Sequence, residues 1–278
     1  MRLGAPSFGS FATPEEWALA HRAKGYSAAF CPVGADADED TVQAWVKAAA
    51  DHDIIIAEVG AWSNPISPDD AERKAALELC KTQLALADRV GARCCVNIVG
   101  SRGPRWDGPD PANLTEDTFA LAVDSTREII DAVQPTRTYY TLETMPWVFP
   151  DSPQSYARLI KAIDREHFAV HLDPVNMVNS IYRFYDTASL LRESFALLGP
   201  HIRSCHAKDI INVQHLTLHF DETRPGLGVM DFAVYLRELS KLDPDTPLMI
   251  EHLPSEDEFD AAAAHIRAVA AQEGLSFR

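Results

Sequence analysis

The sequence predicts an α/β protein built as a single (β/α)8 barrel domain over residues 1–278. Three observations predict this fold. Short apolar runs recur eight times along the chain, stretches with helical periodicity separate them, and the connections before and after the runs differ in length. Eight strand-and-helix repeats account for the whole chain and leave no segment for a second domain. A closed barrel is therefore favoured over an open sheet.

The eight runs are the predicted strands. Several are apolar throughout, as a parallel strand that is buried on both faces requires. In chain order they are Leu3–Ala5, Ser27–Cys31, Ile54–Val59, Cys94–Val99, Tyr139–Met145, Phe168–Asp173, Ile202–Ala207 and Leu248–Leu253.

Two of the intervening segments are the clearest helix candidates. The segment from about Asp69 to Val90 repeats apolar residues on one helical face, and Gly91 follows it as a stop signal. The segment from about Ser255 to Glu273 has a similar apolar stripe, and its acidic start complements the helix dipole. We therefore expect a long helix at each place.

The links from strand to helix are much longer than those from helix to strand. The longest are Gly100–Leu114, Pro174–Asp186 and Asp209–Met230. Loops of this kind cover the catalytic face of a barrel. Aromatic side chains in or beside them suit the apolar faces of a sugar, so we expect Trp106 and Trp147 to line a substrate site.

Composition narrows the classes of partner. The formal net charge is -16, from 41 acidic and 25 basic residues, so the overall field repels nucleic acid and anionic membranes. No stretch approaches the roughly 20 apolar residues that span a bilayer, and no secretion signal is evident. The five cysteines lack C-x-x-C spacing, which argues against a disulfide framework or a zinc ribbon. We expect a cytoplasmic protein that binds neither nucleic acid nor membrane.

Four of the predicted strands end in side chains that bind metals: Glu143, Asp173, His206 and Glu251. The carboxyl ends of parallel strands meet at one end of a barrel, so these groups should lie together. A carboxylate at the end of an apolar strand is costly unless a cation compensates its charge. Three oxygen ligands and one nitrogen suit one divalent ion, Mn²⁺ or Mg²⁺ with Co²⁺ also compatible, better than a structural zinc.

Three further residues near strand ends are candidates for substrate binding. Glu58 lies at the end of the third run and Asn97 late in the fourth, so both are expected to point to the barrel mouth and bind sugar hydroxyls. Lys208 shares a face with His206 by the two-residue period of a strand. It is expected either to bind a substrate oxygen or to neutralise Asp209.

Several motifs extend these strand ends: Leu142-Glu143, His171-Leu172-Asp173-Pro174-Val175-Asn176, Cys205-His206-Ala207-Lys208-Asp209, Arg224-Pro225-Gly226-Leu227-Gly228 and Ile250-Glu251-His252. With them the chain resembles, over essentially its whole length, the xylose-isomerase-like barrel superfamily. It is most similar to the branch often labelled sugar phosphate isomerase/epimerase, with ketose 3-epimerases, inosose dehydratases and C-glycoside deglycosidase relatives. The resemblance implies the same four metal ligands, in the order Glu, Asp, His, Glu.

The resemblance also implies roles for these residues. In the ketose 3-epimerases the metal holds a carbonyl oxygen and the adjacent hydroxyl oxygen. Glu143 and Glu251 would then be the catalytic pair on opposite sides of the carbon between them, one removing a proton to give an enediolate and the other returning it. Arg224 matches an arginine that contacts substrate.

The chain departs from the family at one informative position. Asn176 stands where the epimerases carry a substrate-contacting histidine, and an amide donates a hydrogen bond but does not shuttle a proton. His171 shares a strand face with Asp173. It either replaces that histidine in part, as a substrate-binding residue, or is a packed, hydrogen-bonded residue of the barrel.

The leading hypothesis is a metal-dependent isomerase or epimerase of a sugar or keto-sugar. A lyase is the first alternative, because the same enediolate can expel a group by β-elimination from a 3-oxo-glycoside or an inosose. A non-catalytic sugar-binding or partner subunit is the second. A nuclease of the endonuclease IV type is disfavoured, because it needs a histidine-rich zinc cluster and a basic face. The sequence leaves open the substrate, its phosphorylation, and whether the chain forms a homo-oligomer or needs a small second subunit.

Overall fold

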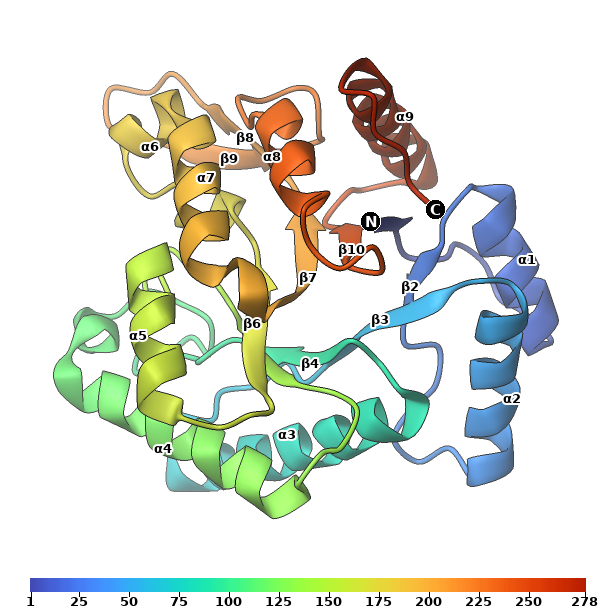
Figure 1. Ribbon diagram of the computed structural model, residues 1–278. Helices are drawn as coiled ribbons and strands as arrows, with labels where there is room; N and C mark the ends of the chain where they lie inside the picture. The colour runs from blue at the N-terminus through green and yellow to red at the C-terminus, as the bar shows by residue number, and fades with distance from the viewer.

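The computed structural model describes residues 1–278, and its centre is a closed barrel of eight parallel strands (Figure 1). The strands are β1 (Arg2–Gly4), β2 (Ala28–Phe30), β3 (Ile55–Gly60), β4 (Cys94–Asn97), β5 (Tyr140–Glu143), β6 (Phe168–Leu172), β7 (Ile202–Ala207) and β10 (Pro247–Ile250). Each overlaps one of the eight predicted runs. Neighbours along the chain pair in parallel, and β1 closes the circle on β10. The predicted barrel is confirmed.

Helices surround these strands (Figure 1). They are α1 (Pro14–Ala23), α2 (Glu39–Asp51), α3 (Asp70–Val90), α4 (Glu116–Val133), α5 (Pro153–Ile163), α6 (Ile181–Tyr185), α7 (Thr187–Leu198), α8 (Phe232–Leu239) and α9 (Glu256–Gln272). The side chains of Asp69 and Ser255 accept hydrogen bonds from the first turns of α3 and α9, and Gly91 ends α3 at φ 68°. Both long helices therefore lie where the sequence predicts them.

Tyr156 of α5 shows how the helices position the strand ends. Its buried hydroxyl accepts hydrogen bonds from the backbone N–H groups of Leu142 and His171, each at 3.2 Å. It also donates to the Leu142 carbonyl at 2.6 Å. These bonds tie α5 to β5 at Leu142, next to Glu143, and to β6 at His171, two residues before Asp173. The last residues of both strands are thereby held in a fixed register.

One element differs from the prediction. The expected loop Asp209–Met230 contains an antiparallel hairpin of β8 (Asp209–Asn212) and β9 (Phe220–Thr223). Polar residues interrupt both strands, Asp209 and Asn212 in β8 and Asp221 to Thr223 in β9, which explains why the apolar pattern does not reveal them. The hairpin lies against α6 (Figure 1), where Phe220 stacks on Phe184 with ring centroids 4.9 Å apart.

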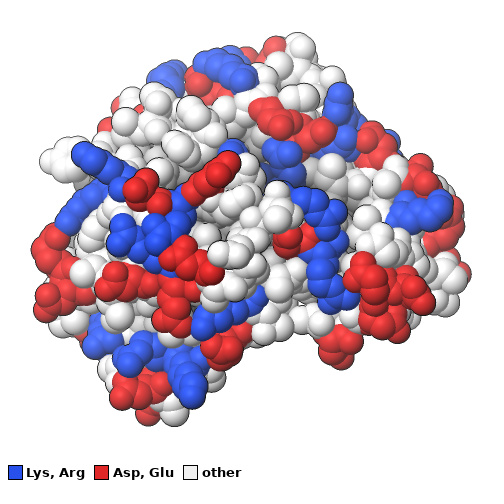
Figure 2. All heavy atoms as spheres, turned by 60° about the horizontal axis from the view of Figure 1, so that its bottom comes forward, with Lys and Arg blue, Asp and Glu red and all other residues white.

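Basic side chains are interspersed with acidic ones on the face shown in Figure 2, without the continuous basic surface that tracks a phosphate backbone. No helix has the length and apolar character needed to cross a membrane. All five cysteines are free.

The two chain ends lie together (Figure 1), where the backbone N–H of Arg278 donates to the Met1 carbonyl at 3.3 Å.

Candidate metal centre and active site

The four predicted ligands converge at the carboxyl end of the barrel. Glu143 is the last residue of β5, Asp173 and Glu251 directly follow β6 and β10, and His206 is the penultimate residue of β7. One ligand atom from each lies within 4.8 Å of all the others. The Nδ1 atom of His206 is 2.8 Å from Glu251 Oε1, 3.4 Å from Glu143 Oε1 and 3.5 Å from Asp173 Oδ2.

The donor atoms themselves indicate that this group fits a metal ion. Asp173 Oδ2, His206 Nδ1 and Glu251 Oε1 are buried atoms that make no regular hydrogen bond, although the Lys208 ammonium lies 2.7 Å from the first oxygen and 2.5 Å from the second. One lysine charge does not balance three carboxylates, so donor atoms that face a common point without regular hydrogen bonds fit a bound cation. Three carboxylate oxygens and one imidazole nitrogen form a donor set that suits a divalent ion such as Mn²⁺ or Mg²⁺.

Lys208 provides a fixed positive charge beside these carboxylates. Its Nζ atom lies 2.5 Å from Glu251 Oε1 and 2.7 Å from Asp173 Oδ2. Burial lowers the pKa of the ammonium, but Asp173, Glu143 and Glu251 outweigh this effect and hold its pKa well above the usual value. The prediction that Lys208 could neutralise Asp209 is wrong, because successive residues point to opposite sides of the chain here.

Asp209 instead organises the loop that follows the hairpin. Its carboxylate accepts hydrogen bonds from the backbone N–H groups of Ile210, Gly226, Gly228 and Met230, at 2.8 to 2.9 Å. This loop includes Arg224. The buried carboxylate therefore satisfies four backbone donors and fixes the loop next to the barrel mouth.

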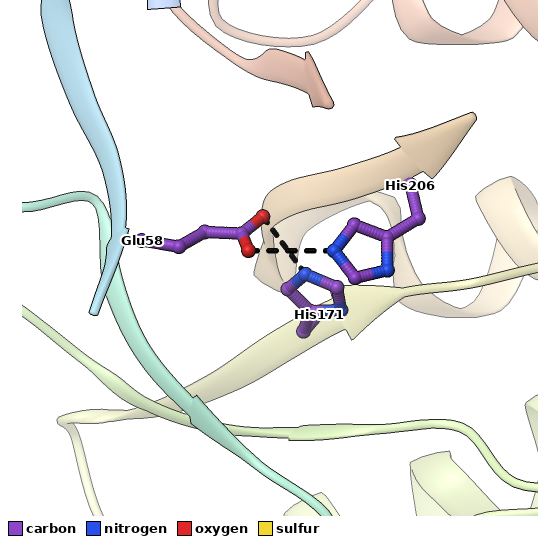
Figure 3. Close-up of side chains that lie close together, drawn as sticks. All are labelled: Glu58, His171 and His206. Carbon is purple, nitrogen blue, oxygen red and sulfur yellow. Dashed lines mark hydrogen bonds and ion pairs between the residues drawn. The ribbon is translucent and has the colours of Figure 1, made fainter. Parts of the chain in front are cut away.

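A second cluster shares His206 with the four ligands and adds Glu58 and His171 (Figure 3). Glu58 accepts from the Nε2 atoms of His171, at 2.9 Å, and His206, at 3.3 Å. The expectation that Glu58 reaches the mouth is wrong, because β3 continues to Gly60 and Glu58 is buried. Burial raises the pKa of Glu58, but the two imidazoles outweigh it and hold the pKa well below its usual range.

His171 is the packed, hydrogen-bonded histidine that the sequence allowed as one alternative. Its side chain is fully buried, and its ring meets that of His206 edge-on with centroids 4.1 Å apart. Its Nε2 atom is directed at Glu58, and a contact of this ring with substrate stays a prediction.

The expectation that Asn97 points to the barrel mouth is also wrong. Its amide donates to Cys80 Sγ at 3.2 Å, and its oxygen accepts from the backbone N–H of Ser63 at 3.1 Å. Cys80 belongs to α3, so Asn97 faces the helical layer rather than the barrel interior. Side chains alternate between the two faces of β4, and this alternation sets the direction of Asn97. A position near the end of the strand does not by itself direct a side chain to the barrel mouth.

Two other predicted residues lie at the mouth. Asn176 donates from Nδ2 to Glu143 Oε1 at 3.1 Å, so it contacts a proposed ligand. Arg224 pairs through Nε with Glu258 Oε2 at 2.8 Å. Arg224 also lines a pocket of about 230 Å³ together with Lys208 and Glu251. This pocket borders the proposed metal centre, because Glu251 and Lys208 belong to both.

The two tryptophans lie in the expected loops but do not line this pocket. Trp147, which follows β5, donates from Nε1 to the Asp107 carbonyl at 2.8 Å and so ties two loops together. Trp106 lies in the loop after β4 and is partly exposed.

Glu222 is a site residue that the sequence analysis missed. Its Oε1 atom lies 3.3 Å from Lys208 Nζ, and its Oε2 atom lies 3.0 Å from His252 Nδ1. The contact depends on the pairing of β8 with β9, which brings Glu222 back over the end of β7. No local pattern in the sequence signals that pairing.

The model of the xylose isomerase-like TIM barrel family matches residues 17–269. The chain belongs to this family. No curated protein matches it in a sequence comparison.

Solved structures with the same barrel extend the comparison. The probable 3-DHS dehydratase AsbF of Bacillus anthracis is 16% identical, with 97% of this chain and 99% of that one covered and a TM-score of 0.72. The 3-keto-D-glucoside 4-epimerase YcjR of E. coli is 15% identical, with 96% and 99% covered and a TM-score of 0.68. A Mycobacterium smegmatis barrel protein in complex with magnesium is also 15% identical, with 98% and 97% covered and a TM-score of 0.69. At such identities the likeness shows the shared fold alone.

Proposed function

We propose that this protein is a divalent-metal-dependent isomerase or epimerase of a sugar or keto-sugar, which removes a proton from the carbon next to a carbonyl group. The observation that carries the proposal is the convergence of Glu143 and Glu251, from β5 and β10, with Asp173 and His206 within 4.8 Å of one another. The likeness to a 3-keto-D-glucoside epimerase supports it.

The chemistry needs both a positive charge and two carboxylates. A bound divalent cation would supply the charge that stabilises the developing oxyanion. One of the two glutamates would remove the proton from the carbon next to the carbonyl, giving an enediolate. The other would return a proton to that carbon from the opposite face, which inverts it. Return of a proton to the former carbonyl carbon, with loss of the neighbouring hydroxyl proton, would move the carbonyl instead.

Neighbouring residues hold these two carboxylates in place. Asn176 donates a hydrogen bond to Glu143, and the Lys208 ammonium contacts Glu251. A carboxylate that is fixed before substrate binds needs no reorganisation as the proton moves, which is how positioned groups lower a barrier. Arg224 and His252 line the adjacent pocket and present donors to substrate oxygens.

A lyase is the second candidate, favoured by the likeness to a probable dehydratase. The first step would be the same proton removal, after which the electron pair expels a hydroxyl or glycosidic oxygen from the next carbon. An isomerase conserves the mass of its substrate, whereas a lyase releases water or an aglycone. Mass spectrometry of the products therefore separates the two.

The test is solvent deuterium exchange in a panel of keto-sugars: hexuloses, 3-keto-glucosides and inososes. Glu143→Gln and Glu251→Gln each keep an oxygen ligand and the side-chain shape but remove the basic carboxylate. Exchange next to the carbonyl should fall by at least about 100-fold in each, the lower end for a lost general base. The comparison is made at saturating Mn²⁺ with metal occupancy measured.

Asn176→Ala is the comparison variant: the amide donates a hydrogen bond to Glu143 but carries no proton, so its loss should slow exchange far less than either glutamine change. It should raise KM more than it slows exchange. If both glutamine variants exchange at the wild-type rate while fully metallated, the two-glutamate mechanism is wrong.

A further inference from the structure

The side chain of Glu58 collects three hydrogen-bond donors inside the barrel. His171 Nε2 and His206 Nε2 lie 2.9 and 3.3 Å from its two oxygens, and the Ser204 hydroxyl also donates to Oε1. All four side chains are buried, and they come from β3, β6 and β7. Figure 3 shows the carboxylate facing both imidazole rings.

A carboxylate only accepts hydrogen bonds, so a ring nitrogen that faces it must carry a hydrogen. For His206 this places the hydrogen on Nε2. Without a cation the same rule gives Nδ1 a hydrogen as well, because Nδ1 lies 2.8 to 3.5 Å from Glu251, Glu143 and Asp173. A bound cation would displace that hydrogen, and the Nδ1 lone pair is then the one that the ring can offer. The opposite tautomer would direct an N–H at the proposed metal position and a lone pair at the Glu58 carboxylate.

We infer that Glu58 is a positioning residue that fixes the ring orientation and tautomer of His206, so that Nδ1 is the nitrogen offered to the cation. This inference rests on the proposed metal centre. His171 adds to the constraint: its ring stands at 78° to that of His206, so it restricts rotation from the side. Partners of this kind behind a metal-bound histidine fix its tautomer and tune its affinity for the ion.

The same trio could instead hold a second metal ion, since Glu58, His171 and His206 each offer a ligand atom within 4.8 Å of the others. The Ser204 hydroxyl argues against this reading, because it already donates to Glu58 Oε1. The number of ions bound decides between the two readings.

The first test is Mn²⁺ binding by calorimetry to the wild type and to Glu58→Gln. The glutamine side chain cannot accept hydrogen bonds from both imidazoles in the way that the carboxylate does. The Kd for Mn²⁺ should therefore rise by about 10- to 100-fold in the variant. Thr141→Val is the control: it removes another buried hydrogen bond of the barrel, 3.1 Å to the Cys95 carbonyl, and should leave the Kd within about twofold. A folded Glu58→Gln protein with wild-type affinity would overturn the inference. So would a second Mn²⁺ equivalent in the wild type that this variant loses.

The second test needs no variant. Nitrogen NMR of ¹⁵N-histidine-labelled wild type, loaded with diamagnetic Zn²⁺, reports which ring nitrogen is bound and which carries hydrogen. We expect one ring with Nδ1 bound and hydrogen on Nε2, and the reverse would overturn the inference. Failure of the wild type to bind metal would refute the proposed function as well. Metal binding that Glu58 does not affect would refute this inference alone.

Discussion

Glu251 shows how strongly single residues in this site depend on compensating charge. Burial raises its pKa, but the nearby His206 and Lys208 outweigh that effect and hold the pKa at about 2. The carboxylate is therefore ionised at neutral pH even though most of its surface is covered. Removing a positive partner would leave buried negative charges together, which is why cations must accompany three carboxylates in so small a space.

A different buried residue, His21, should make stability sensitive to acid. Burial lowers its pKa from 6.5, although a hydrogen bond to the Trp17 carbonyl at 2.9 Å opposes the shift. The folded state therefore binds fewer protons than the unfolded state. Its contribution to stability is complete above pH 6.5 and is lost as the pH falls toward the lower folded-state pKa.

Thermal unfolding between pH 8 and 5 checks this expectation. The Tm of the wild type should fall more steeply below pH 6.5 than that of His21→Gln, in which the titrating group is absent. Parallel pH profiles for the two proteins would show that His21 does not contribute to the acid sensitivity.

At the scale of elements, the β8–β9 hairpin brings new groups over the barrel mouth. Glu222 reaches Lys208 and His252 from β9, and Asp209 anchors the loop that carries Arg224. Gly228 packs so closely on this anchor that a Cβ atom there would lie 2.3 Å from Asp209 Oδ1. The hairpin and its loop are therefore built as one unit around a single carboxylate.

Replacing Asp209 with asparagine tests that unit. One oxygen becomes an NH₂ group that faces two backbone N–H donors, so the protein should lose about 1–3 kcal/mol of stability. Amide hydrogen exchange should also accelerate at the two donors left unpaired. Leu227→Ala, an exposed position in the same loop, should change stability by less than about 0.5 kcal/mol. Equal effects of the two changes would contradict the anchoring role.

The strand ends explain why much of the site could be predicted from sequence. In a closed parallel barrel the carboxyl ends of all strands meet, so Glu143, Asp173, His206 and Glu251 had to converge once their strands were recognised. Two other positions could not be predicted in this way. The position of Glu58 depends on where β3 ends, and the direction of the Asn97 side chain depends on the pleat of β4. The contact between Glu222 and Lys208 depended on a short polar hairpin, whose pairing no apolar pattern reveals.

At the scale of the whole molecule, the barrel brings residues from distant parts of the sequence to one point. Glu58 and Glu251 come from β3 and from the residue after β10, and both lie within hydrogen-bond range of the His206 ring. The outer helices bury the strands, so these polar groups are held in a rigid frame. The loops at the strand ends are then free to differ in sequence without disturbing that frame.

The central claim is that one divalent cation binds among these four side chains. Crystals of the full chain grown with Mn²⁺ and measured at the manganese absorption edge test it most directly, with elemental analysis of the same protein. We expect one anomalous peak per chain, bounded by Glu143, Asp173, His206 and Glu251, and about one equivalent of metal. An ordered site without metal in the presence of Mn²⁺, or a peak elsewhere in the barrel, would contradict the claim.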